Sequence, residues 1–237
     1  MGVASLRLLR VFAFAALCLA AWAQAPSGQS AAITPHSRID LFNGRDLSGW
    51  DVFLDRPGQD PDKTWHVRDG VIRCEGQPYG YARTKASYAN YLLHVEWRWP
   101  GAAGNSGVFV HMSGPDKTLP KAYECQLLSG DAGDMWMLDP EITCREHAAQ
   151  GVRSSNVGKP VWYKNGLLKL NRSSEKPVGE WNTMQIICRD DWIVVLVNGV
   201  LQNVATRASQ TSGKICLQSE GTPVEFLNVY LEPIDIQ

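Results

Sequence analysis

Short stretches in which apolar and polar residues alternate run along most of the chain. Period-two alternation puts successive side chains on opposite faces of a β-strand. It predicts strands over residues 39–42, 65–67, 71–74, 91–99, 108–112, 122–128, 184–189, 193–197, 200–204, 214–218 and 224–231. Asp69-Gly70 and Asn198-Gly199 separate neighbouring strands, as expected of tight hairpin turns. Only residues 141–150 carry a modest helical pattern, so the chain predicts one antiparallel β-sandwich or jelly roll over residues 39–237.

The first 38 residues differ from this pattern. Arg7 and Arg10 precede an apolar run over residues 11–21 and then small residues up to Ala25, which predicts a secretory signal peptide over residues 1–25. The apolar run is too short to span a membrane comfortably. Residues 26–38 are rich in Ser, Ala, Pro and Gln and predict a flexible leader. We therefore expect a periplasmic or extracellular bacterial protein.

The charge and the cysteine content exclude some classes of partner and of metal site. The formal net charge is −1 and no basic cluster stands out, which argues against a nucleic-acid partner. Five cysteines follow the predicted signal peptide. Cys125 and Cys144, joined by a loop, are the candidate disulfide pair, whereas Cys188 and Cys216 lie in strand patterns and are interpreted as small core residues. No Cys-x-x-Cys spacing suggests a thiolate zinc site.

Candidate chemistry concentrates on residues 104–126. Gly104 to Gly107 predicts a turn, in which glycine permits positive φ and Asn105 bonds its own backbone. Alternation then places Val108, Val110 and Met112 on the core face of one strand and Phe109 and His111 on the opposite face. On the next strand, Glu124 and Gln126 oppose Tyr123, Cys125 and Leu127. His111, Glu124 and Gln126 are thus expected to project together, as a plausible sugar-handling site.

Each candidate also has a structural explanation. Glu124 could pair with a neighbouring basic residue on a solvated face, and His111 could bond a loop carbonyl. The alternating His94, Glu96 and Arg98 could form a cross-strand charge ladder on an exposed face.

Four phrases point to a known family. They are LFNGRDLSGW at 41–50, GNSGVF at 104–109, GEWNT at 179–183 and LQSEGTPVEF at 217–226. Over residues 39–232 the chain resembles the secreted bacterial 3-keto-disaccharide hydrolases, also described as 3-keto-glucoside 1,2-lyases and 3-keto-2-hydroxy-glucal hydratases. The resemblance implies a concanavalin A-like jelly roll. Many members carry Asp-His-Gly where this chain has Ser219-Glu220-Gly221, and an arginine where it has His111, so Glu220 would have to replace the family's histidine.

The activity implied by the resemblance sets three chemical requirements. Cleavage of a 3-keto glycoside needs a base for the C2 proton, a donor or cation for the enolate oxygen and an acid for the C1 leaving oxygen. Glu124 or His111 fits the base, with the other as acid, and Glu220 is a third catalytic candidate. The enolate oxygen could be stabilised by Arg83, Lys121 or Arg98, or by a divalent metal. The sugar hydroxyl groups could be bound by Gln126, Gln218 and Asn105. Glu96, beside Arg98 on the same strand, is a further substrate-binding candidate. His111, Glu124 and Glu220 would form a nitrogen–oxygen set suited to manganese, zinc or calcium.

The resemblance also implies a partner, a sugar 3-oxidoreductase that makes the keto sugar. Two other functions remain open at this point. One is a carbohydrate-binding module without catalysis, because jelly rolls often only bind sugar. The other is a retaining glycosidase with two carboxylates about 5–5.5 Å apart. The cluster of ionisable residues favours an enzyme over a binding module.

Overall fold

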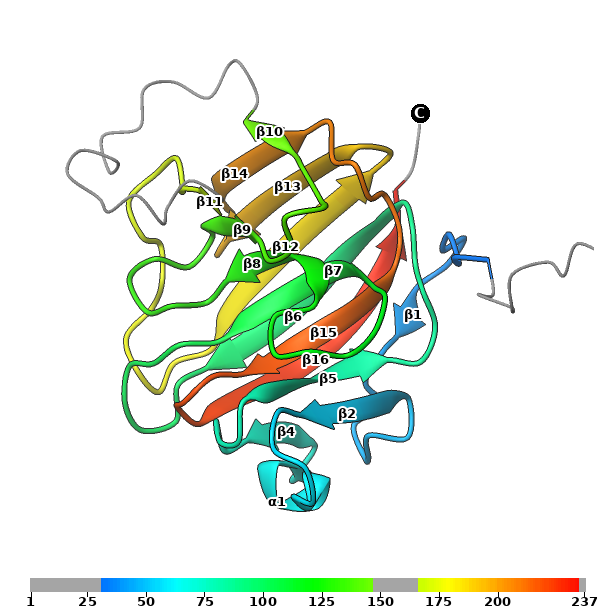
Figure 1. Cartoon of the computed structure of the whole chain (residues 1–237). Coiled ribbons are helices and arrows are strands. Elements are labelled where there is room, and N and C mark those ends of the chain that lie inside the picture. The colour runs from blue at the N-terminus through cyan, green and yellow to red at the C-terminus, as the bar shows by residue number, and fades with distance from the viewer. Residues whose placement is uncertain (1–30, 147–165, 235–237) are drawn as a thin grey trace, which may run out of the picture.

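The computed structural model describes residues 31–146 and 166–234, and over these residues the chain forms two antiparallel β-sheets packed face to face (Figure 1). The β-sandwich expected from the alternation is confirmed. The only helix in the described part is a single turn, α1 (Pro61–Thr64), which Asp60 caps by accepting a hydrogen bond from the Asp62 amide. No helix among the described residues is both long and apolar enough to cross a membrane.

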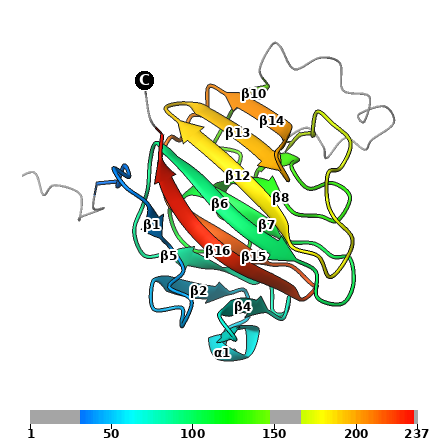
Figure 2. The ribbon, with the colours of Figure 1, turned by 180° about the vertical axis from the view of Figure 1, so that it is seen from behind.

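One sheet, which faces the viewer in Figure 2, has nine strands within the described residues. In sheet order they are β10 (Arg145–Glu146), β14 (Val200–Thr206), β13 (Trp192–Val197), β12 (Asn182–Arg189), β6 (Tyr91–Arg98), β16 (Val224–Pro233), β4 (Val71–Cys74) and β3 (Trp65–Arg68), with β1 (Ile39–Asp40) paired to β16. Burial in β6 alternates strictly between buried and half-buried positions, as its sequence predicts.

The other sheet has seven strands over the same described residues and faces the viewer in Figure 1. In order they are β11 (Gly166–Leu167), β9 (Met135–Met137), β8 (Lys121–Gln126), β7 (Gly107–Ser113), β15 (Lys214–Ser219), β5 (Gly80–Thr84) and β2 (Trp50–Leu54). We call the face of this sheet that points away from the nine-stranded sheet the outer face.

The main core fills the space between the sheets. Trp97, Phe226 and Trp65 from the nine-stranded sheet and Tyr123 and Leu217 from the seven-stranded sheet are all fully buried in it. A second buried cluster lies on the outer face and contains Tyr81, Phe109, Met112, Ala122 and Cys216. The outer face is therefore not a simple solvated surface, because part of it is covered.

The predicted hairpin turns are confirmed. Asp69 and Gly70 have φ values of 54° and 75° between β3 and β4, and Asn198 and Gly199 have 49° and 77° between β13 and β14. Two consecutive positive φ angles are what a two-residue type I′ turn requires.

Three expectations are wrong where the structure describes the residues. Residues 141–146 are not helical, because Arg145 and Glu146 pair with β14, and residues 147–150 lie outside the described part. The second half of the expected flexible leader is docked on the sandwich, since the Ile33 amide donates to the Ser87 carbonyl and its own carbonyl accepts from Ala89. Cys125 and Cys144 are free thiols, as are Cys74, Cys188 and Cys216. The predicted signal peptide, residues 1–25, lies outside the described residues.

Candidate active site

The outer face carries two rows of side chains that run across neighbouring strands. The pairing register puts Trp136, Glu124, Phe109, Cys216 and Arg83 in one row. The next row along the strands contains Gln126, Gly107, Gln218, Tyr81 and Phe53. Glu124 and Gln218 thus stand on either side of β7, where Gly107 offers no side chain.

Gly107 makes room for the functional groups beside it. A Cβ atom at this position would lie 2.4 Å from Glu124 Oε1 and 3.0 Å from Gln218 Oε1. Gly107 does not have a positive φ, so its role is close approach rather than a special backbone conformation. This corrects its interpretation as a turn former. The two side-chain oxygens converge on one point above β7.

Glu124 is buried, with a relative exposure of 5%, and no donor among residues 31–146 and 166–234 contacts its Oε1. Burial, and secondarily the nearby charge of Glu220, raises the pKa of Glu124 well above its usual range. Such a carboxyl group holds a proton at higher pH than an exposed one, and it is a strong base once it ionises. Buried unpaired carboxyl groups in clefts are typical of functional sites.

Glu220 follows β15 and is half-buried. Burial raises its pKa, and a hydrogen bond from the Gln218 side chain opposes that rise. Because the charge of Glu220 acts on Glu124, the two carboxyl groups form a coupled pair. The structure thus brings Glu124, Gln218 and Glu220 together, as three of the sequence candidates.

Asn105 belongs to the adjoining loop. The Ser106 hydroxyl donates to the Gln218 carbonyl oxygen at 2.8 Å, and a Cβ on Gly104 would lie 2.4 Å from the Thr222 side chain. Asn105 therefore sits on a segment packed against the segment that carries Glu220. Its buried Oδ1 also has no donor. Three buried acceptors, Glu124 Oε1, Gln218 Oε1 and Asn105 Oδ1, await hydrogen-bond donors such as sugar hydroxyl groups.

His111 does not join this group, which corrects the predicted triad. The register of β7 shifts between Val110 and Ser113, and His111 has a φ of 57° there. The β-bulge inverts the alternation, so Met112 reaches the outer face while His111 points into the core. His111 stacks edge-on against Tyr91 and Tyr123 and hydrogen-bonds through Nδ1 to the Gln210 carbonyl at 3.0 Å.

The proposed metal set of His111, Glu124 and Glu220 is wrong for the same reason. The sheet itself separates the imidazole from the two carboxyl groups, so the three side chains cannot bind one ion. No group of three His, Cys, Asp or Glu side chains in the described part of the chain is arranged to hold a metal.

Arg83, Lys121 and Gln126 are engaged elsewhere. Arg83 lies on the outer face but forms an ion pair with Asp116. Lys121 belongs to the opposite alternation of β8 from Glu124 and pairs with Glu141 at 2.9 Å. Gln126 is on the outer face, where its Oε1 accepts from the Leu127 and Leu128 amides, each at 2.9 Å, so that oxygen caps the end of β8.

Glu96 and Arg98 lie outside the site altogether. They belong to β6 of the nine-stranded sheet (Figure 2), at half-buried positions that alternate with the positions facing the core. Glu96 contacts His94 and Asn228, and Arg98 donates to Glu225 at 2.6 Å. The structural explanation, a cross-strand charge network, is the correct one for this strand.

Sequence reasoning missed two residues that shape the site, Asp116 and Thr222. Asp116 fastens a loop over the outer face by accepting from Tyr81 Oη at 2.8 Å and from Arg83. Thr222 packs against Gly104 and also against Gly76, where a Cβ would lie 2.5 Å from the Thr222 backbone. The Gly-Pro-Asp stretch at 114–116 signals a loop, but no local pattern reveals which strand a loop crosses.

The arrangement suits acid–base chemistry on a hydroxyl-rich ligand. Burial raises the pKa values of both carboxyl groups, so each can hold a proton at higher pH than an exposed carboxyl group, and each can take up or give a proton during a reaction. The unpaired acceptors would bind hydroxyl donors.

Solved structures with the same fold include several carbohydrate-active proteins. A candidate glycosyl hydrolase from Parabacteroides distasonis is 26% identical, with a TM-score of 0.59, and covers 84% of this chain and 94% of its own. The Bacillus licheniformis β-glucanase (16%, TM-score 0.54, 84% and 99% coverage) and the carbohydrate-binding module CBM66 from Bacillus subtilis (11%, 0.54, 78% and 95%) share the fold alone. No curated protein matches the chain significantly.

The family model that describes the 3-keto-alpha-glucoside-1,2-lyase-like domain matches residues 37–232. This range includes the strands of both sheets up to the last residue but one of β16, and it agrees with the range over which the four sequence phrases resemble the family. Together with the Parabacteroides distasonis structure, it indicates a glycosyl hydrolase-like, carbohydrate-active domain. The chain belongs to the 3-keto-alpha-glucoside-1,2-lyase-like domain family.

Proposed function

We propose that this protein cleaves 3-keto glycosides by elimination followed by hydration, with Glu124 and Glu220 as its acid–base pair. The 3-keto group makes the C2 proton acidic and places the C1 substituent β to a carbonyl. The family supports this substrate class, and the coupled carboxyl pair supports a reaction that consists of proton transfers.

In the elimination, ionised Glu124 takes the C2 proton and protonated Glu220 gives its proton to the C1 oxygen as the aglycone leaves. We assign the base to Glu124 because it is the deeper group and is fixed beside Gly107 on a strand. Glu220 lies at the half-buried rim, where the leaving group can depart.

In the hydration, the roles reverse. Water adds to C1 of the enone and loses a proton to Glu220, and Glu124 returns its proton to C2. Both carboxyl groups regain their starting states, and the net reaction is hydrolysis of the glycosidic bond. Gln218 and Asn105 supply amide groups that bind the sugar's polar groups during both steps.

The observation that carries the proposal is the unpaired, buried Glu124 carboxyl group coupled to Glu220 on the outer face. A carboxyl group that served stability would have a cationic partner, as Glu225 has in Arg73 and Arg98 on the other sheet. Leaving Glu124 without one lowers the stability of the fold, so the site is expected to serve the ligand.

The test is turnover of a 3-keto glucoside by the wild type and by Glu124→Gln and Glu220→Gln. Each substitution keeps the shape of the side chain but removes the transferable proton, and turnover should fall by ~10²–10⁴. Glu96→Gln is the matched control, since it removes a half-buried carboxylate from the opposite sheet, and it should leave turnover unchanged. If Glu124→Gln keeps its melting temperature and turns over the substrate at near wild-type rate, the active site does not lie on the outer face.

The same assay separates the other two functions. A carbohydrate-binding module would bind the plain and 3-keto glucosides without turning either over. A retaining glycosidase would cleave the plain glucoside. Our proposal requires cleavage of the 3-keto compound alone.

The proposal also implies where the enzyme acts and what supplies it. A sugar 3-oxidoreductase is needed to make the substrate, because the proposed reaction starts from a sugar whose C3 is already a ketone. The predicted signal peptide supports an action outside the cytoplasm, and the mass of the mature chain in a periplasmic or secreted fraction tests that placement.

A further inference from the structure

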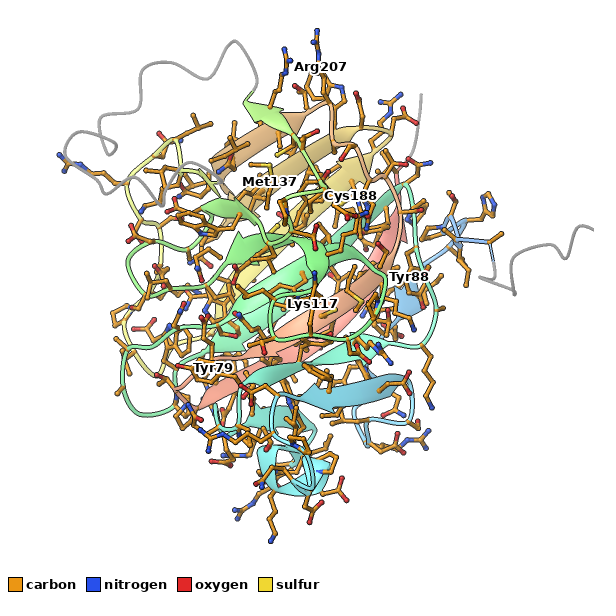
Figure 3. The ribbon with its side chains drawn as sticks, viewed as in Figure 1. Tyr79, Tyr88, Lys117, Met137, Cys188 and Arg207 are labelled. Carbon is orange, nitrogen blue, oxygen red and sulfur yellow. The ribbon has the colours of Figure 1, made fainter. Side chains whose placement is uncertain are left out.

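One end of the outer face is closed. Residues 114–120 cross it between β7 and β8, and Asp116 fastens them by accepting from Tyr81 Oη and from Arg83. Lys117 adds an ion pair with Asp139 at 2.5 Å, and Figure 3 shows Lys117 in front of the seven-stranded sheet. Phe109 and Met112 are consequently only 0% and 1% exposed although they lie on an outer face.

The opposite direction, past Glu220, is open. Gly221 and Gln77 are exposed there, and the Tyr79 side chain is 39% exposed. A Cβ on Gly221 would lie 3.5 Å from Tyr79 Oη and 3.9 Å from Gln77 Nε2, so both side chains lie beside this exposed glycine. In Figure 3, Tyr79 lies well away from Lys117, toward the lower left of the sheet.

The segment that carries Tyr79 is held firmly to the one that carries Glu220. The Gly221 amide donates to the Gly76 carbonyl at 2.6 Å, and the Ser219 hydroxyl donates to the Pro78 carbonyl at 2.8 Å. On its other side, the Tyr79 carbonyl accepts from the Asp55 amide at 2.8 Å. Tyr79 therefore keeps a fixed position relative to Glu220.

We propose that Tyr79, with Gln77 beside it, forms the aglycone subsite and binds a ring-shaped leaving group, either a second hexose or an aryl ring. This inference rests on the proposed function, which puts the keto ring at Glu124. A glycoside extends beyond that ring only through its C1 substituent, and the loop over residues 114–120 closes the other direction. The aglycone must then pass Glu220, where Tyr79 offers an aromatic face for stacking and Gln77 an amide for hydroxyl groups.

The experiment compares 3-keto glucosides that carry a methyl, a glucosyl or a 4-nitrophenyl aglycone. Tyr79→Ala should lower kcat/KM about tenfold for the two ring aglycones, mainly through KM, and leave the methyl glucoside unchanged. Tyr79→Phe should retain most of the wild-type value because it keeps the ring. Trp192→Ala removes an exposed aromatic side chain from the other sheet and should change none of the three.

Equal losses on the methyl and ring substrates, or no loss on any, would overturn the subsite. If the wild type turns over none of the three substrates, the proposed function fails, and the subsite is then judged by calorimetric binding of unmodified cellobiose. Weaker binding to Tyr79→Ala but not to Trp192→Ala would support it. Equal binding by all forms, or no binding by the wild type, would overturn it.

Discussion

Two buried glutamates of the sandwich, Glu225 and Glu124, have different roles, one structural and one functional. Glu225, 2% exposed, lies between Arg73 at 2.7 Å and Arg98 at 2.6 Å. Glu124, 5% exposed, has no basic partner in the part of the chain that the structure describes, and the acidic Glu220 is the charge that acts on it. A buried pair is satisfied by its own contacts, whereas an unpaired carboxyl group is satisfied only by a ligand or a proton. Contact, rather than burial, separates the functional residue from the structural one.

His111 provides the prediction at the residue scale. Burial lowers the pKa of His111 from 6.5 to about 4, against the opposing hydrogen bond to Gln210. The unfolded chain then binds the extra proton more readily, so the stability from neutral His111 is lost as pH falls from about 6.5 to about 4, by up to about 3 kcal/mol. His111→Phe keeps a ring against Tyr91 and Tyr123 but cannot take up a proton. The excess stability of the wild type over this variant should therefore shrink on acidification.

Urea unfolding of both forms at a series of pH values between about 4 and 8 measures this difference. The comparison cancels the titration of Glu124 and Glu220, whose raised pKa values act in the opposite direction. A constant difference across the range would show that His111 is not buried as a neutral group.

At the element scale, the segment that carries Glu220 depends on glycine. Thr222 fits between Gly76 and Gly104, and a Cβ on Gly104 would lie 2.4 Å from its side chain. Gly104→Ala should displace Thr222, and with it Glu220, so that the coupling to Glu124 weakens. We expect a fall of kcat of about tenfold or more, because a displaced Glu220 no longer holds its carboxyl group in the position needed for proton transfer.

Gly101→Ala is the control, because a Cβ at Gly101 would meet nothing within 4 Å. It makes the same chemical change in the same loop without the contact. The measurement is kcat of Gly104→Ala and of Gly101→Ala on a 3-keto glucoside, each compared with the wild type. If both behave alike, the close packing of Thr222 does not position Glu220.

Elements set by local chemistry were predictable, and elements set by distant partners were not. The Asn198-Gly199 hairpin follows from the φ angles that Asn and Gly tolerate. The β-bulge at His111 has no such signal, since Val110-His111-Met112 reads as regular alternation. One extra residue in the register moved His111 off the site, and pairing with β14 replaced the expected helix at Arg145. The sequence thus predicted where the strands lie, but not which residues of β7 face the core beyond the β-bulge.

At the scale of the whole molecule, the fold could be predicted from local sequence patterns, whereas the site could not. Alternation and turn residues suffice for a two-sheet sandwich, because each strand reports its own buried face. The site needs contacts between segments far apart in the chain, such as Gly107 with Gln218 and Gly104 with Thr222. The family resemblance supplied Glu220 and Gln218, whereas Asp116 and Tyr79 emerged only once the loops were placed against the sheets.

The cysteines give the last prediction, which concerns the stability of the entire domain. Cys74, Cys125, Cys144, Cys188 and Cys216 are all free thiols, so no covalent cross-link restrains the unfolded chain. Burial raises the pKa of Cys74 and of Cys144 to about 11 and that of Cys188 to about 12, so these thiols stay protonated and unreactive at neutral pH. Reductant should therefore leave the melting temperature unchanged. Thiol titration of the mature protein should find five groups in denaturant and few or none in the native state. A fall of several degrees on reduction, or fewer than five thiols in denaturant, would show that Cys125 and Cys144, or another pair, form a disulfide after all.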